Sequence, residues 1–430
     1  MRKERIAIIG TGAAGMVCGH LLHPRFDIHL YEKNDYIGGH ANTFTLSEGE
    51  ETVCLDTAFV IFNNAAYPVF CRLLDELGVP SMRCAMSFGF QILPANLEYV
   101  TRGLSYCFCD FRNLVRPSFL RMLWQMARFH RQAKEVLEQD RFHQLTIREY
   151  LKERGYSDEF LNHFLVPLIA VTWSIPPDTM MDYPVLSLIE FLRNHGALQG
   201  ILGSKHWRTV INGSQSYVKR LVAPFPERIS TQCPITHIHR DKEKIRLEDA
   251  QGNTLTCERV ILACHADQAL RLLADPSSQE QEILGQFRYH ATQAVVHTDL
   301  SIMPKKRRNW AAWNYLVDRD DNDTLRASFT YHMNTLQRVS DKVDYFVTIN
   351  DSTRIDPEKI LKVFDYEHPI FDLQAIKAQK KLHLLNENGR TYFCGSYSGF
   401  GFHEDAMRSG VEVCEKIAGE RFLPAKYSFR

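Results

Sequence analysis

The spacing of apolar positions predicts how strands and helices alternate along the chain. Residues 6–9 form a continuous apolar run, and residues 28–31 form a second apolar run, interrupted by His29, about twenty positions later. Runs of this length are typical of strands buried on both faces of a parallel sheet. Glycines at positions 10, 12 and 15 separate the first run from a short helical segment. The N-terminal pattern therefore predicts a strand, a glycine turn, a helix and a second strand.

Related patterns recur in the second half of the chain. Short strands are predicted at residues 234–239, 244–248 and 254–257, followed by a nearly all-apolar strand at 259–264. Residues 392–394 predict another strand, which leads through a glycine-rich turn into a helix over residues 403–418 with an apolar stripe. In the first half, residues 54–63 predict a strand and residues 67–77 a helix. An antiparallel meander thus leads back into a parallel sheet.

The intervening segments have a different composition, which indicates a second domain. Residues 76–204 show helical periodicity with many bulky side chains, and residues 271–385 mix strands and helices. We therefore predict the α/β fold class, with a Rossmann-like domain carrying a β-meander (residues 1–75, 205–270 and 386–430). A discontinuous α+β substrate domain would contain residues 76–204 and 271–385. The aromatic stretch 310–331 fits either the floor of an apolar pocket or ordinary core.

The first glycine turn carries the clearest chemical signal. Its sequence, GTGAAG over residues 10–15, includes Ala13 and Ala14, and Glu32 ends the following strand. Gly10 permits a tight turn, Gly12 allows a pyrophosphate to approach the backbone, and Gly15 allows close packing of helix on strand. The helix N-terminus favours negative charge. Glu32 can accept hydrogen bonds from ribose hydroxyls and would repel a 2′-phosphate. The pattern predicts a dinucleotide site that disfavours NADP.

Two further glycine-rich turns can bring backbone close to the same ligand. Gly38, Gly39 and His40 follow soon after Glu32, and Gly395 and Ser396 follow the last predicted strand. The C-terminal turn leads into a helix N-terminus, which indicates a second anion site.

Composition excludes several classes of function. Lysine plus arginine and aspartate plus glutamate both number 51, and no nucleic-acid-binding motif is present. Eleven cysteines without a CxxC pair indicate a reducing compartment, and histidine and cysteine spacing predicts no metal. No signal peptide and no uncharged apolar window of eighteen residues occurs, so we expect a cytoplasmic protein.

Residues 111–134 combine basic and apolar side chains. All of the charged residues between Phe111 and Lys134 are basic, and leucines, phenylalanines and Trp124 alternate with them. Two interpretations fit equally well: a cationic amphipathic helix lying on the inner face of an anionic membrane, or a solvated helix covering the substrate domain.

Taken together, five segments resemble the amine-oxidase-like FAD superfamily, which includes monoamine oxidases, protoporphyrinogen oxidases and carotenoid desaturases. The matching segments are GTGAAG with Glu32, GGHANT, CPITHIHRD, ERVILACHADQAL and YFCGSYSGFGFHEDAMRSG. The resemblance implies FAD as the cofactor. Its implied contacts are Gly10, Gly12, Ala13, Ala14, Gly15, Glu32, Gly38, Gly39, His40, Ile235, Gly395, Ser396, His403 and Ala406. Ser396 departs from the superfamily, which often has an acid at that position.

A narrower resemblance suggests the substrate. The segments LDTAFVIFN, VTWSIP, FLRNHGAL and YHMNTLQ are similar to those of a bacterial subgroup commonly encoded beside enzymes resembling cyclopropane-fatty-acid synthases. Some members desaturate methyl-branched acyl chains on the route to furan fatty acids. The resemblance implies an FAD-dependent oxidoreductase that takes hydride from a methyl-branched unsaturated acyl chain of a lipid. The alternatives are a flavin-containing amine oxidase and a redox-neutral flavoprotein that uses FAD structurally.

Candidate catalytic residues follow from these expectations. His403 and Glu404 are the first candidates for a base, with Asp56 and Tyr67 as further ones, while Asn63 and Trp173 are candidates for the flavin face. In the alternative interpretation, Glu404 complements a helix N-terminus and His403 packs against the flavin.

Overall fold

The computed structural model describes residues 3–173, 180–194, 207–319, 323, 325–387 and 389–422. Parts of the VTWSIP and FLRNHGAL segments and the side chain of Trp173 lie outside the described residues, so the expectation for Trp173 stays a prediction. Within the described part of the chain, no helix is both long and apolar enough to cross a bilayer.

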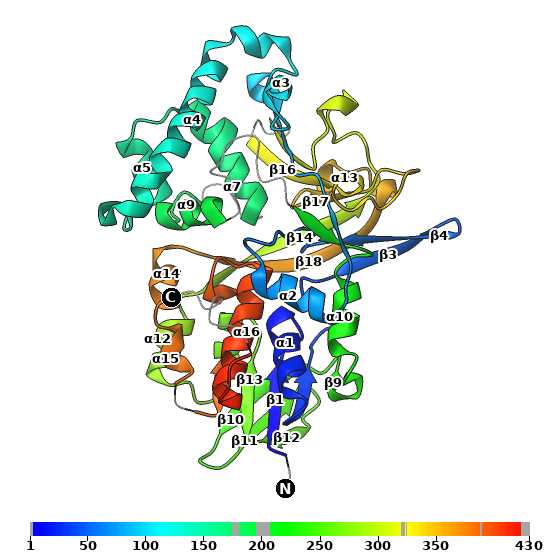
Figure 1. Ribbon diagram of the computed structural model, residues 1–430, viewed down its shortest axis with the longest axis vertical. Helices are drawn as coiled ribbons and strands as arrows, with labels where there is room; N and C mark the ends of the chain where they lie inside the picture. The colour runs from blue at the N-terminus through cyan, green and yellow to red at the C-terminus, as the bar shows by residue number, and fades with distance from the viewer. Residues whose placement is uncertain are drawn as a thin grey trace.

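A five-stranded parallel sheet forms the lower half of the molecule in Figure 1. Its strands are, in spatial order, β19 (Thr391–Phe393), β13 (Arg259–Leu262), β1 (Arg5–Ile9), β2 (Asp27–Tyr31) and β9 (Ile229–Ser230). Both faces are buried, as the continuous apolar runs predicted: Ile6 and Ile8 face one core, and Ala7 and Ile9 face another.

Helices cover one face of this sheet and the meander covers the other. The first face carries α1 (Ala13–Leu22), α10 (Gln215–Val222), α2 (Pro68–Glu76) and α16 (His403–Ala418). The second carries β10 (Ile235–Arg240), β11 (Ile245–Asp249), β12 (Thr254–Cys257), α11 (Ala266–Leu272) and α12 (Ser278–Leu284). The antiparallel meander and the helix over residues 403–418 were both predicted.

Helices α1 and α16 lie side by side in Figure 1 and approach each other closely. A Cβ placed on Gly410 would lie 2.8 Å from the carbonyl oxygen of Ala14. The thiol of Cys18 donates a weak hydrogen bond to the carbonyl oxygen of Gly410 at 3.5 Å. The last helix of the chain is therefore packed directly against the first.

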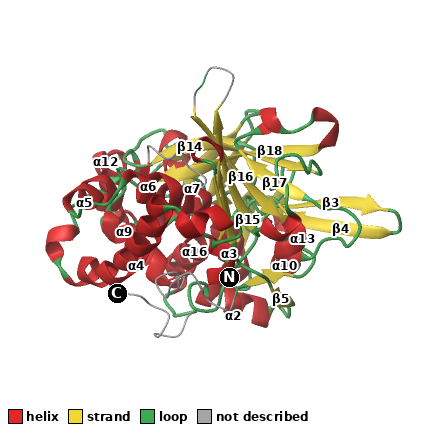
Figure 2. Ribbon diagram, turned by 90° about the horizontal axis from the view of Figure 1, so that it is seen from above, coloured by secondary structure: helices red, strands yellow, loops and turns green. Residues whose placement is uncertain are grey.

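A second, seven-stranded sheet lies above the first (Figures 1 and 2). Its spatial order is β18 (Ile360–Ile370), β14 (Arg288–His297), β17 (Phe346–Ile349), β16 (Leu325–His332), β15 (Trp313–Arg319), β6 (Phe88–Ile92) and β7 (Leu97–Val100). Only β6 and β15 pair in parallel among these neighbours.

Helices gather beside this sheet at the upper left of Figure 1. They include α3 (Leu104–Cys107), α4 (Pro117–Glu138), α5 (Ile147–Glu153), α6 (Asp158–Phe160), α7 (Val166–Trp173) and α9 (Val185–Asn194). Between α6 and α7 lies a π-helical turn, η4 (Leu161–Leu165). These helices and the sheet share one apolar core.

Smaller elements complete the described chain. A hairpin of β3 (Thr43–Glu48) and β4 (Glu51–Asp56) packs against the core of the large sheet. Strand β5 (Ser81–Arg83) pairs with β8 (Arg208–Val210). The remaining helices are α13 (Met333–Gln337), α14 (Leu373–Gln379) and α15 (Leu382–Leu385).

The strand predicted over residues 54–63 was wrong in its second half, because β4 ends at Asp56. The backbone N–H of Asp56 donates to the side-chain oxygen of Gln337, and its buried carboxylate accepts hydrogen bonds from Thr43 and Ser214. These bonds satisfy the polar groups of Asp56 where its pairing with Thr43 ends the hairpin. Residues 57–61 continue as a loop, part of which lines the cavity described below, and Phe62 forms an isolated bridge with Arg208.

Candidate active site

One large cavity lies between the two sheets and has a volume of about 1150 Å³. It is lined by all three glycine-rich turns at one end and by aromatic side chains of the large sheet and its helices at the other. The cavity thus joins the predicted dinucleotide site to the second layer of the fold.

The first glycine turn presents backbone amides to this cavity. Gly12 precedes α1 with extended backbone, no side chain caps the helix, and no acid occupies its first turn. Gly12, Ala13 and Ala14 line the cavity, and nothing lies within 4 Å of a Cβ placed on Gly12. Uncapped amides facing open space form an anion site. The structure therefore brings these three predicted residues together at a position suited to phosphate.

Gly10 and Gly15 hold the turn in shape. Gly10 has φ +100° and lines the cavity, whereas Gly15 is not among its lining residues. A Cβ on Gly15 would lie 2.0 Å from the carbonyl oxygen of Gly10 and 3.3 Å from the Cβ of Ala263. Gly15 therefore allows α1 to pack on β1 and β13, as predicted from its position.

Glu32 lies at the cavity wall but is already partly bonded. Its Oε2 accepts hydrogen bonds from the N–H and hydroxyl of Thr11 at 3.0 and 2.6 Å, and Oε1 accepts one from the N–H of Asn34 at 3.0 Å. A carboxylate has about four lone-pair sites, so further acceptor capacity is available to ribose hydroxyls. Thr11 was missed by the sequence analysis, although its hydroxyl helps to orient Glu32.

The second glycine turn packs onto the first. Gly38 and Gly39 have φ values of +114° and +58°, and a Cβ on Gly39 would lie 3.2 Å from the Cα of Gly12. His40 is next in the chain and lines the cavity, and its Nε2 is buried without a hydrogen-bond partner among the described residues. Burial, with the nearby His368, lowers the pKa of His40 well below its usual value. A neutral imidazole nitrogen therefore faces the cavity and needs a partner.

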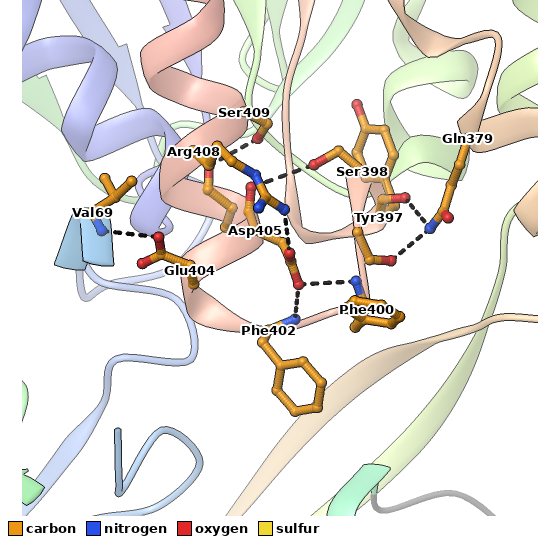
Figure 3. Close-up of polar contacts among 12 residues, drawn as sticks. Val69, Gln379, Tyr397, Ser398, Phe400, Phe402, Glu404, Asp405, Arg408 and Ser409 are labelled. Carbon is orange, nitrogen blue, oxygen red and sulfur yellow. Dashed lines mark hydrogen bonds and ion pairs between the residues drawn. The ribbon is translucent and has the colours of Figure 1, made fainter. Parts of the chain in front are cut away.

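The third turn is held by hydrogen bonds to Asp405 near the start of α16 and from Gln379 at the end of α14 (Figure 3). The carboxylate of Asp405 accepts hydrogen bonds from the N–H groups of Phe400 and Phe402 at 2.9 and 3.0 Å. Gln379 donates to the carbonyl oxygens of Tyr397 and Gly399 at 2.9 and 2.6 Å. A carboxylate of the chain therefore lies at the N-terminus of α16, which was predicted as a second anion site. Gly395, Ser396 and Ala406 line the cavity, as does Ile235 at the start of β10.

His403 and Glu404 face in different directions. His403 lines the cavity, stacks on Phe59 with ring centres 4.0 Å apart, and shares a 2.6 Å hydrogen bond with the hydroxyl of Tyr217. Burial lowers the pKa of His403 to about 3. Its imidazole is therefore neutral at physiological pH.

Glu404 instead binds the N-terminus of α2 (Figure 3). Its Oε1 accepts a hydrogen bond from the N–H of Val69 at 2.9 Å, and its Oε2 accepts one from Phe70 at 3.0 Å. Burial raises the pKa of Glu404 to about 7. Because Glu404 is not among the lining residues of the cavity, this geometry supports the alternative interpretation of a residue that complements a helix N-terminus.

The other candidate residues also divide into those that line the cavity and those that do not. Tyr67 lines the cavity, and burial raises the pKa of its hydroxyl, so the phenol is neutral. Asp56 and Asn63 are buried but are not among the lining residues; Asn63 accepts hydrogen bonds from the N–H groups of Ala65 and Ala66. Asp56 belongs to the buried network with Ser214 and Gln337 that ends β4.

Several lining residues were missed by the sequence analysis. They come from the loop after β4 and from β18, which lies far along the chain: Phe59, Ile61, Tyr366 and His368. His40 packs against both β18 residues, with ring centres 4.9 Å from Tyr366 and 5.1 Å from His368. No local pattern marks these residues, because the tertiary fold brings them to the cavity.

The far end of the cavity is mostly apolar. We call it the apolar arm and define it by six lining residues from β6, β15, α4, η4 and α7: Phe88, Phe90, Trp313, Met126, Phe164 and Leu168. The arm meets the third turn where Phe191 stacks on Phe402, with ring centres 5.1 Å apart. The aromatic stretch after residue 310 thus contributes to an apolar pocket as well as to core.

The residues at the glycine-lined end fit a bound dinucleotide. An uncapped helix N-terminus, open space in front of Gly12 and the unpartnered Nε2 of His40 all face this part of the cavity. The fold and the site together define a dinucleotide-dependent oxidoreductase with a separate apolar substrate chamber.

Comparison with known families identifies the dinucleotide. The sequence profile of the family described as flavin containing amine oxidoreductase matches residues 13–299, and the chain belongs to this family. The family is flavin-containing, which establishes FAD as the cofactor. FAD bound at the glycine-lined end would accept a hydride from the substrate. A comparison with curated proteins found no match.

Solved structures share the whole fold at low sequence identity. Wild-type putrescine oxidase bound to putrescine has a TM-score of 0.68 at 13% identity, covering 98% of this chain and 100% of that chain. Cyclohexylamine oxidase from Brevibacterium oxydans has a TM-score of 0.65 at 13% identity, covering 97% and 100%. A CLA-producing fatty acid isomerase from P. acnes has a TM-score of 0.65 at 14% identity, covering 97% and 98%. The predicted two-domain fold class is confirmed.

Proposed function

We propose that this protein is an FAD-dependent enzyme that desaturates an acyl chain, with a methyl-branched unsaturated fatty acyl group of a lipid as its substrate. The apolar arm carries this proposal. Its six defining residues have no charge, and the acids among all described lining residues of the cavity are Glu32, Asp365 and Glu367. Glu32 is bonded to Thr11, and Glu367 lies beside His265. An alkyl chain matches this arm, whereas an ammonium group would be buried there without a carboxylate.

Desaturation removes a hydride from an activated allylic carbon and a proton from its neighbour. The hydride passes to FAD, and the proton requires an acceptor on the protein. We propose His403 for this role, because its imidazole lines the cavity and lies next to Phe402, where the arm meets the third turn.

We expect His403→Asn to slow flavin reduction by acyl substrate by about 100-fold while FAD stays bound, since removal of a proton acceptor typically costs that much. Rapid-mixing kinetics under anaerobic conditions measure this rate. Tyr217→Phe, which removes only the hydroxyl bonded to His403, serves as the comparison. A His403→Asn rate within a few-fold of the unmodified rate would show that His403 only packs in the cavity.

The substrate itself is tested by the visible spectrum of the anaerobic holoenzyme. Phospholipid carrying methyl-branched unsaturated acyl chains is expected to bleach the flavin band, and the matched saturated lipid is not. Bleaching by putrescine or cyclohexylamine instead would overturn the acyl proposal in favour of amine oxidation. A flavin that neither class reduces would favour a redox-neutral protein.

A charge in the arm supplies a sharper test. Phe88 is half-buried and lines the arm, so Phe88→Glu would place a carboxylate against the alkyl chain. We expect kcat/KM for the acyl substrate to fall about 100-fold, because burying an unpaired charge costs several kcal/mol. FAD content, read from the absorbance ratio, should not change. Phe88→Leu is the matched control and should retain most activity; equal activity of the two variants would contradict an acyl-binding role for the arm.

A further inference from the structure

A cluster of exposed apolar side chains covers one end of the molecule, the end where α3 and α4 lie in Figure 1. Phe111, Val115 and Trp124 are 76%, 80% and 59% exposed. They belong to η2 (Phe111–Val115) and to the first turns of α4. We call this cluster the apical patch and define it by six residues: Leu93, Phe111, Leu114, Val115, Leu120 and Trp124.

The six residues come from two chain segments that hydrogen bonds hold together. Leu93 begins η1 (Leu93–Ala95), and the guanidinium of Arg116 donates a 3.3 Å hydrogen bond to the carbonyl oxygen of Ala95. Arg112 also donates to the side-chain oxygen of Asn96 at 3.3 Å. The turn after β6 is therefore tied to η2. Single exposed apolar residues are common on protein surfaces, but a contiguous group marks an interaction surface.

The exposure is not explained by the packing of α4. This helix already has a buried face, formed by Phe119, Met122, Met126 and Phe129, which enters the main core. Leu120 and Trp124 point away from that core and are 43% and 59% exposed. The predicted amphipathic helix is therefore apolar on two faces, and only one of them has a partner within the described chain.

The charge around the patch selects the partner. Residues 93–134 contain seven lysines and arginines against two acids, although the whole chain carries equal numbers of each. Arg112, Arg116 and Arg121 alternate with the apolar residues of the patch; Arg112 pairs with Asp110 and Arg121 with Glu159, and exposed Arg131 and Lys134 extend the basic surface. Exposed aromatic and aliphatic side chains set among cations match the interface of a bilayer that contains anionic lipids.

Helix α4 lines the cavity as well as carrying part of the patch. Buried Met126 and half-buried His130 on α4 line the cavity, as does exposed Arg102. The apolar arm therefore extends to the same helix that carries Leu120 and Trp124. An acyl chain entering here from a bilayer would exchange one apolar environment for another and avoid exposure to water.

We propose that the apical patch docks this protein on the surface of an anionic bilayer, inserting the side chains of Phe111, Val115 and Trp124 at the headgroup boundary. Docking places α4, which also lines the apolar arm, against the lipid. The inference goes beyond the proposed reaction, since a docked surface delivers hydrophobic substrates of any class.

Vesicle flotation of the full-length, FAD-loaded protein tests this surface without relying on activity. We expect binding to vesicles of phosphatidylglycerol and phosphatidylcholine to exceed binding to pure phosphatidylcholine by at least tenfold, and to weaken as salt is raised. The double variant Phe111→Ser, Trp124→Ser is expected to lose about tenfold in binding to the anionic vesicles. The matched control is Leu300→Ser, Val363→Ser, at residues that are 51% and 37% exposed on other elements, and it should bind normally.

Three results would overturn the proposal: no flotation with anionic vesicles, equal binding of the patch and control variants, or a dimer in light scattering that the patch variant disrupts. The last result would assign the patch to a second copy of the chain. Flavin bleaching by lipid dispersed in detergent measures the reaction separately, so failure of docking and failure of the proposed function can be distinguished.

Discussion

The Gly12→Glu protein is expected to fold and to be colourless. A Cβ at Gly12 meets nothing within 4 Å, and the backbone there has an ordinary negative φ, so the substitution itself causes no clash. The new carboxylate would occupy the space in front of the α1 amides, where we expect the pyrophosphate. Repulsion between these anions in a partly buried site should weaken FAD binding by more than about 100-fold. The absorbance ratio of purified protein measures the loss, and circular dichroism verifies the fold.

Two other glycines separate the effect of charge from the effect of shape. Gly389→Glu adds the same charge in an exposed turn and should leave the protein fully yellow. Gly15→Ala should instead fail to accumulate as folded protein, since its Cβ would lie 2.0 Å from the carbonyl oxygen of Gly10. A yellow Gly12→Glu protein would refute the assignment of this turn to the pyrophosphate.

Glu404→Gln is expected to change how stability depends on pH. Burial raises the pKa of Glu404 from its ordinary 4.5 to about 7 in the folded protein. Between pH 4.5 and 7 the folded protein keeps a proton on Glu404 that the unfolded chain has released. The stability that this proton contributes is complete below pH 4.5 and is lost as pH rises through 7. This pKa shift corresponds to a change of about 3 kcal/mol in the free energy of unfolding. Glutamine does not titrate, so the variant lacks this pH dependence. Its NH₂ group cannot accept a hydrogen bond from an α2 amide, and the loss of that bond costs about 1 kcal/mol of stability at every pH.

The expected result is a crossing of two stability curves. At pH 5 the Glu404→Gln protein should have the lower Tm, and at pH 8 its Tm should equal or exceed that of the unmodified protein by a few degrees. Glu50→Gln, in the exposed β3–β4 turn, provides the control and should follow the unmodified protein at both pH values. Parallel curves for Glu404→Gln would contradict a raised pKa. Loss of flavin reduction without any stability change would return Glu404 to the candidates for a base.

Local pattern predicted the parts of the site that depend on short-range geometry. The glycine turn at residues 10–15, the meander and the helix over residues 403–418 each follow from the conformational needs of a few adjacent residues. Glu404 shows where such reasoning ends. Its partners Val69 and Phe70 lie more than 330 positions away, so no spacing could distinguish a helix-capping carboxylate from a catalytic one.

Helix α4 shows a second reason why part of the structure could not be predicted from the sequence. One amphipathic pattern predicted a single apolar face, yet Phe119 and Met126 enter the core while Leu120 and Trp124 remain exposed. Composition marked the segment as unusual, but the packing of α4 decides which side chains are available to a partner. Likewise, His40 was found through its glycine neighbours, whereas Tyr366 and His368 required the pairing of β18 with β14.

The contact between α1 and α16 has a consequence for folding. Several elements around β1 lie far along the chain: β13 follows some 250 positions later, and β19 and α16 later still. Closing such long loops is slow, because their chain entropy is lost before the contacts that compensate for it are formed. The third glycine turn joins the pocket only through these long-range contacts. A ligand held by all three turns therefore binds only the folded chain and stabilises it by mass action.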